Sequence, residues 1–148
     1  MTETGHAIIG AAIATKIPDL RISIPLILLS HVLGDLPDHW DTGENWQEKG
    51  LKKVAFDSII DLTLGFILVT IIFVFGLGQD PATMFIAVFA SQFFDYLEFP
   101  HFFLHWKGTP WSWINDFNHL FHKKIPSFNL TATWQAIISG VFLLWAFT

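Results

Sequence analysis

One long apolar segment, VAFDSIIDLTLGFILVTIIFVFGLG over residues 54–78, most constrains what this chain can fold into. Its charged residues are Asp57 and Asp61, both near its start. An α-helix rises about 1.5 Å per residue, so this segment is long enough to cross a hydrocarbon core roughly 30 Å thick. A second run, residues 130–147, carries no charge and is close to the minimum spanning length. The sequence therefore predicts an all-α integral membrane protein.

The composition agrees with a membrane protein and argues against an ordinary soluble domain or a nucleic-acid-binding protein. Of the 148 residues, 52 % are hydrophobic and 14 % are charged, whereas soluble domains carry roughly 25 % charged residues. Residues 1–148 are short enough to form a single domain. The net charge of −5 argues against a nucleic-acid partner, which would need a basic surface. The first residues lack the basic region of a secretory signal peptide, so we expect them to remain in the mature protein.

Hydropathy predicts five helices, over residues 5–15, 22–39, 54–78, 81–99 and 130–147. We expect a polytopic bundle of about four to five helices in a prokaryotic inner or cell membrane, with the short first helix a partial span. Two predicted loops are rich in lysine: Lys49, Lys52, Lys53, Lys107, Lys123 and Lys124. The positive-inside rule places both loops in the cytoplasm. Lys16 and Arg21 fall on the opposite side if the first helix crosses.

Ionisable residues gather at the predicted cytoplasmic helix ends. A charged residue within a membrane segment costs roughly 2.5–3.5 kcal/mol, so it is retained when it pairs, binds a ligand or lines a wet cavity. His31 and Asp35 are four residues apart, and His39 continues the same helix face. Asp57 and Asp61 repeat that spacing on the next helix. Two like charges one turn apart repel unless a cation or a proton separates them.

Convergence of these side chains predicts a metal site. The chain has no cysteine, so the ligands must be histidine and carboxylate, a set that suits zinc first and manganese or iron as alternatives. Asp95 ends another helix, and His119 and His122 are three residues apart, so they can share a target. The number of candidate ligands allows one or two ions. A remaining carboxylate, Asp57 or Asp38, would act as the general base.

Simpler interpretations compete at each motif. His31 and Asp35 alone could form an ion pair at a helix end. The stretch from Asp38 to Asp41 could be a cap and turn at the membrane interface. His101 and His105 lie in a tryptophan-rich stretch typical of that interface, and we favour an interfacial role for them. The metal hypothesis rests on several such clusters lying on one side of the membrane.

The motifs TGHAIIGAAIA, SHVLGDLPDH, SQFFDYLEF and HLFH, in this order, resemble a known family. It is the family of small integral-membrane metal-dependent hydrolases that includes the LexA-binding inner-membrane-associated proteins. By motif the resemblance implies eight metal-site residues: His6, His31, Asp35, His39, Asp61, Asp95, His119 and His122. The His-x-x-x-Asp element is also similar to one in the zinc-dependent phospholipase C and nuclease group.

The expected function is metal-dependent hydrolysis of a phosphoester in a lipid or lipid-linked substrate that enters from the bilayer. An activated water would attack phosphorus, and the metal would stabilise the developing charge. Three alternatives remain open: a metal or proton transporter or relay, a di-iron membrane oxidoreductase, and a membrane adaptor with a structural metal. We expect membrane lipids as partners.

Overall fold

The computed structural model describes residues 1–37, 39–43, 45–119 and 128–148, without the side chains of residues 118, 119, 128 and 129. In those ranges the chain forms eight α-helices, one π-helical segment and no strand, which confirms the all-α prediction. The elements are α1 (Glu3–Lys16), α2 (Leu20–Asp35), α3 (Trp46–Lys49), α4 (Leu51–Val69), η1 (Thr70–Gly76), α5 (Pro81–Ser91), α6 (Phe93–Phe103), α7 (Trp111–His119) and α8 (Phe128–Phe147).

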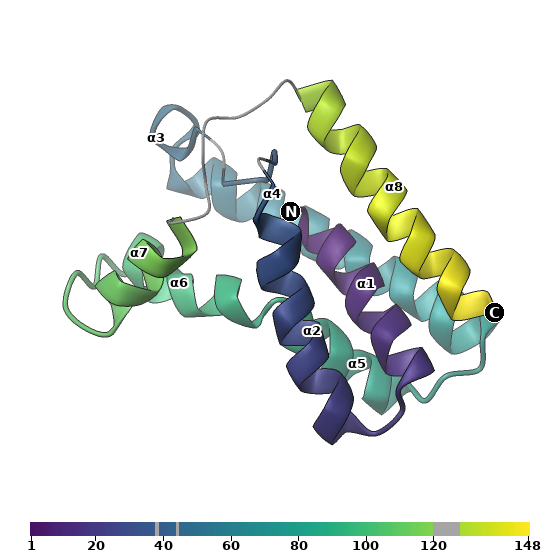
Figure 1. Ribbon diagram of the computed structural model, residues 1–148. Coiled ribbons are helices and arrows are strands. Elements are labelled where there is room, and N and C mark those ends of the chain that lie inside the picture. The colour runs from purple at the N-terminus through teal and green to yellow at the C-terminus, as the bar shows by residue number, and fades with distance from the viewer. Residues whose placement is uncertain (38, 44, 120–127) are drawn as a thin grey trace.

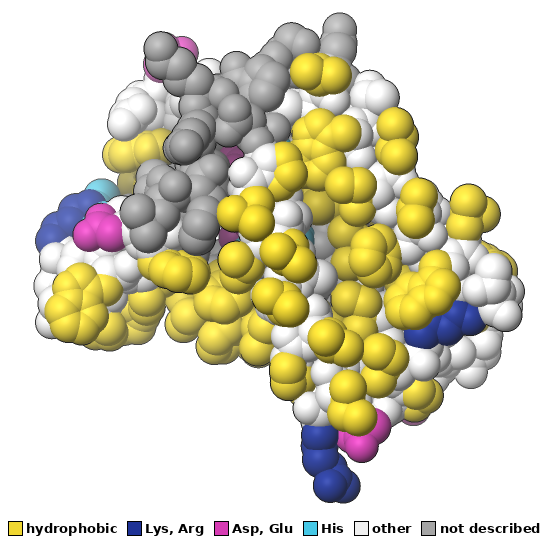
Figure 2. Space-filling model, in the orientation of Figure 1, with side chains coloured by type: hydrophobic (Ala, Val, Ile, Leu, Met, Phe, Trp, Pro, Cys, Tyr) yellow, Lys and Arg dark blue, Asp and Glu magenta, His cyan; other side chains and the backbone are white. Residues whose placement is uncertain are grey.

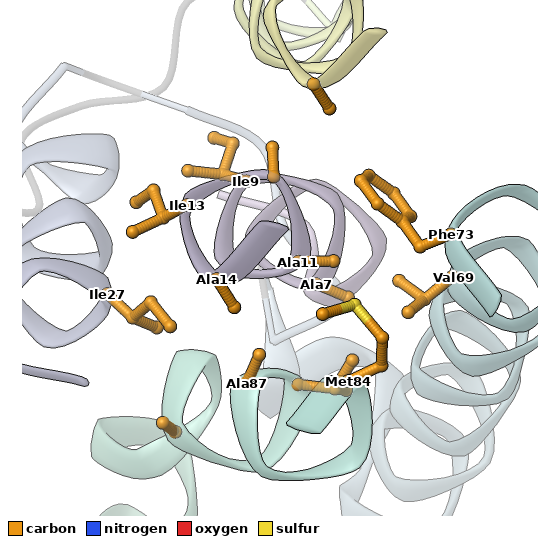
Figure 3. Close-up of a cluster of buried hydrophobic side chains, with 14 of the residues drawn as sticks. Ala7, Ile9, Ala11, Ile13, Ala14, Ile27, Val69, Phe73, Met84 and Ala87 are labelled. Atoms are coloured by element: carbon orange, nitrogen blue, oxygen red, sulfur yellow. The ribbon is translucent and has the colours of Figure 1, made fainter. Parts of the chain in front are cut away.

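Helix α1 is the centre of the bundle and packs against α2, α4, α5 and α8 (Figure 1). Its sequence is rich in glycine and alanine, and small residues let neighbouring helices approach closely. Larger side chains from the surrounding helices, among them Ile27, Phe73 and Met84, point toward it and fill the space (Figure 3). A Cβ atom at Gly10 would lie 2.9 Å from the Ser91 Cβ, so α1 and α5 are in close contact there.

Two helices among the described residues are long and apolar enough to cross a membrane. They are Leu51–Gly76, with a mean hydropathy of 2.5, and Leu130–Phe147, with 1.5. In each, 17 % of the most apolar 18-residue window is buried, whereas the core helix of a soluble protein would be mostly buried. Hydrophobic side chains cover much of the face over α2 and α8 (Figure 2).

Two candidate spans among the described residues do not confirm the expected polytopic bundle of about four to five helices, because two of the predicted helices are shorter than expected. The helix predicted over residues 22–39 ends at Asp35, since Pro37 has no N–H to continue it. The helix predicted over residues 81–99 is interrupted at Gln92, whose φ of −103° and ψ of 7° are not helical. Helix α6 then continues through Pro100 to Phe103, beyond the predicted end at residue 99.

The interruption at Gln92 has a structural cause. The Gln92 side chain is fully buried, and its Nε2 donates to the Glu3 carbonyl at 2.7 Å, which ties the α5–α6 junction to the start of α1. Beyond this junction, α6 and α7 pack on each other and extend to one side of the bundle (Figure 1). The break therefore fixes the neighbourhood of Ser91 beside the ends of α1 and α2.

Candidate metal centre

Three histidines converge on the carboxylate of Asp35. His6 comes from the first turns of α1, His31 from the same face of α2 as Asp35, and His39 from the segment after α2. The Asp35 Oδ1 lies 3.1 Å from His6 Nε2 and 3.4 Å from His39 Nε2, and Oδ2 lies 3.2 Å from His31 Nε2. Donor atoms on one tetrahedral zinc ion, each about 2.0–2.1 Å from the metal, lie about 3.3 Å apart.

In two of the histidines, the hydrogen-bond partner of Nδ1 shows that this ring nitrogen carries a hydrogen. His31 Nδ1 lies 2.7 Å from the Ser91 carbonyl oxygen, and His39 Nδ1 lies 3.0 Å from the Pro37 carbonyl oxygen. A carbonyl oxygen accepts and cannot donate, so each Nδ1 carries a hydrogen. A neutral ring then directs the bare lone pair of its Nε2 at Asp35. This is the arrangement that metal-binding histidines adopt when a carbonyl orients them.

Charged groups of both signs surround the three histidines. Asp35 contacts the amino-terminal ammonium of Met1, and the Asp95 and Asp41 carboxylates lie beside His31 and His39. His6, His31 and His39 are all buried. Buried carboxylates need a compensating cation, and a divalent ion held between the Nε2 atoms and Asp35 would supply that charge.

His6 is held in place by packing. Its ring stacks on that of His31, with centroids 4.0 Å apart and planes 19° from parallel. Burial lowers the pKa of His6 to about 3 despite the nearby Asp35 carboxylate, so the imidazole is neutral, as a metal ligand must be. A Cβ atom at Gly34 would lie 3.3 Å from His6 Cε1, so this glycine leaves room for the ring.

Further carboxylates border the three histidines. Asp95 Oδ1 lies 3.7 Å from His31 Nε2, and Asp41 Oδ2 lies 3.4 Å from His39 Nε2. Glu3 is close enough to feel these charges: burial, followed by Asp95 and Asp61, raises its pKa to about 9. Sequence reasoning did not select Glu3, and it left Asp41 open between a turn and a ligand role. The position of Glu3 one helical turn before His6 was the available signal.

A cavity of about 600 Å³ opens beside this cluster. One part of its wall is polar and includes His31, Asp35, His39 and Asp95. The lining also includes apolar side chains of α4 and α6: Val54, Ile59, Leu62, Phe99, Phe102 and Phe103. The cavity can therefore hold an amphiphilic molecule with its polar group at the histidines and its apolar part against the two helices.

Asp61 lies apart from this group and holds the beginning of α1. Its carboxylate accepts hydrogen bonds from the Glu3 N–H at 2.8 Å, the Thr4 N–H at 3.3 Å and the Thr4 hydroxyl at 2.6 Å. A carboxylate is favourable at a helix N-terminus, where backbone N–H groups have no helical partner. Asp61 therefore positions α1, and through it His6.

The remaining predicted residues are not brought to the cluster by the described structure. Asp57 pairs with Lys53 on the same helix, which supplies the separating cation that the sequence argument required. Asp38 and His122 lie outside the described residues, as does the side chain of His119. Among the described residues, the ligand atoms of His6, His31 and Asp35 all lie within 4.8 Å of one another and form a potential metal site.

Comparison of the chain with protein-family models, with curated proteins and with solved structures finds no match.

Proposed function

We propose that this chain is a membrane-embedded, metal-dependent hydrolase of phosphoesters in lipid or lipid-linked substrates. The observation that carries the proposal is the convergence of three histidine Nε2 atoms on the Asp35 carboxylate, with carbonyl oxygens holding Nδ1 of His31 and His39. The ligand atoms of His6, His31 and Asp35 lie within 4.8 Å of one another. His39 Nε2, 3.4 Å from Asp35 Oδ1, would complete an N₃O donor set for a divalent ion. Zinc is the first candidate, with manganese or iron as alternatives, and one or two ions.

The cavity supports an amphiphilic substrate. Its polar wall contains the proposed ligands, and its apolar wall includes Ile59 and Phe99, whose side chains are also exposed at the surface of α4 and α6. An acyl chain could lie along this wall while the phosphoester contacts the histidines. Since Ile59 belongs to a candidate membrane span, the apolar side of the cavity would face lipid.

The residues of the cluster have distinct proposed roles. His6, His31, His39 and Asp35 hold the ion, which when bound supplies Lewis-acid chemistry: it lowers the pKa of water and polarises a phosphoryl oxygen. Asp95 lines the cavity 3.7 Å from His31 Nε2 and is placed to accept a proton from the attacking water. The sequence assigned this base role to Asp57 or Asp38, but Asp57 pairs with Lys53.

The proposal also includes the family and the cytoplasmic orientation of the site in the membrane. The order of the motifs around His6, His31 and Asp35 supports membership of the family of membrane metal-dependent hydrolases. Lys49 ends α3, and Lys52 and Lys53 begin α4, beside cavity residues Gln47, Leu51 and Val54. The positive-inside rule assigns this side to the cytoplasm.

We expect detergent-purified protein to release phosphate from phosphatidic acid or head group from phosphatidylglycerol. A chelator should abolish the release and added zinc should restore it, because the ion activates water. His31→Ala is expected to lower the rate by at least about a hundredfold, since loss of even an outer-shell partner costs 10- to 100-fold. Glu48→Gln, an exposed substitution on α3, should leave the rate unchanged.

Metal-loaded, folded protein that hydrolyses neither these lipids nor p-nitrophenyl phosphate would contradict the proposal. The outcome would then choose among the alternatives. Bound iron with redox activity would favour the di-iron oxidoreductase, metal or proton flux in vesicles would favour a transporter or relay, and a metal without either activity would favour a structural role.

A further inference from the structure

A second cavity, of about 230 Å³, lies where α3 meets the connection between α6 and α7. Its polar wall contains six residues: Trp46, Gln47, His101, His105, Lys107 and Asn115. Each of these residue types can donate a hydrogen bond. The cavity is large enough for a phosphate group with several water molecules, since each water occupies about 30 Å³ in the liquid.

The charge of this cavity is opposite to that of the larger one. None of its described lining residues is a carboxylate, whereas the larger cavity contains Glu3, Asp35 and Asp95. The Lys107 ammonium lies 3.2 Å from His101 Nε2, and since an ammonium can only donate, the imidazole nitrogen accepts. The Lys107 ammonium has two further N–H groups that can donate to a ligand. A cationic, donor-rich cavity of this kind suits an anion with several acceptor oxygens.

The two cavities are neighbours. Trp46 and Phe102 line both, and their rings meet edge to face with centroids 5.6 Å apart. The surrounding segment is aromatic, and Trp106 and Trp113 are 50 % and 69 % exposed. Tryptophan at such exposure is typical of the level of lipid head groups. The small cavity thus lies beside the proposed lipid cavity, on a segment suited to the membrane interface.

We propose that this second cavity binds the phosphate group of an anionic lipid head group, with Lys107 supplying the charge and the neighbouring imidazole and amide groups supplying hydrogen bonds. The same chemistry would accept free phosphate. The site does not use the metal ligands, so it stands or fails independently of the proposed hydrolysis.

The test is a binding titration of detergent-purified protein, with a chelator present to prevent the proposed hydrolysis, and with three probes: dihexanoyl phosphatidylglycerol, dihexanoyl glycerol and inorganic phosphate. We expect phosphatidylglycerol to bind and the phosphate-free glycerolipid to bind much more weakly. Lys107→Gln should weaken phosphatidylglycerol binding by about 10- to 100-fold, the amount that one hydrogen bond to a charged group contributes. Lys107→Arg should retain most of the binding, because it keeps the charge.

Lys52→Gln is the matched control, since it removes the same charge from an exposed position at the start of α4. Equal weakening by Lys52→Gln, or unchanged binding by Lys107→Gln, would overturn the proposal. Binding of inorganic phosphate that is as tight as that of the lipid, and equally sensitive to Lys107→Gln, would support the phosphate site and assign it to a soluble source. Metal content should be the same in Lys107→Gln as in wild type, which separates this result from the metal centre.

Discussion

Replacing Asp35 with asparagine is expected to lower the affinity for zinc by at least about a hundredfold. Asparagine keeps the shape of the side chain but removes the negative charge on which His6, His31 and His39 converge. Loss of an outer-shell partner alone costs 10- to 100-fold in metal affinity, and Asp35 is a proposed ligand. Competition between the purified protein and a fluorescent zinc chelator measures the change.

Glu48→Gln removes an exposed carboxylate in the same way and should leave zinc affinity unchanged. Thermal unfolding of Asp35→Asn establishes that the variant is folded, which matters because Asp35 also contacts the Met1 ammonium. Folded Asp35→Asn that binds zinc as tightly as wild type would remove Asp35 from the ligand set.

The second large effect is expected at Gly10, on the central helix. A leucine there has to place its Cβ 2.9 Å from the Ser91 Cβ and 3.1 Å from the Ala87 carbonyl oxygen. Backbone cannot move aside as a flexible side chain can, so α1 and α5 would be forced apart. Overpacking typically costs 1–3 kcal/mol and occasionally more, and we expect at least about 3 kcal/mol here. Thermal unfolding in detergent, followed by circular dichroism, would show a lower midpoint or no cooperative transition.

Gly140→Leu on α8 is the matched control. A Cβ atom at Gly140 meets no heavy atom within 4 Å, and leucine favours the helix over glycine, so this variant should be at least as stable as wild type. The account of the bundle fails if Gly10→Leu and Gly140→Leu unfold at the same temperature as wild type.

Hydropathy predicted the all-α fold and the two longest apolar helices, because both properties follow from local sequence. It could not predict the interruption at Gln92, where neither glycine nor proline marks the break. That break depends on a tertiary contact between the buried Gln92 side chain and the Glu3 carbonyl. Pro37 was a visible signal for the end of α2, because proline cannot continue a helix. The predicted helix ran past Pro37 to His39, whereas α2 ends at Asp35.

Within the candidate site, spacing predicted that His31, Asp35 and His39 share a face, and the family resemblance implied His6. The structure brings all three histidines to Asp35. His39 was predicted on a helix face but reaches Asp35 from beyond the helix end. The role of Asp61 depends on which helix start lies beside it, and periodicity within one helix does not contain that information. Its carboxylate binds the first N–H groups of α1.

The most direct test of the central claim is the metal content of detergent-purified wild-type protein, measured by inductively coupled plasma mass spectrometry. The site at His6, His31 and Asp35, with His39 as the proposed fourth ligand, predicts one or two equivalents of a divalent metal, zinc first, which a chelator removes and added metal restores. A folded, monodisperse preparation that contains no metal and takes up none on addition of zinc, manganese or iron would contradict the account.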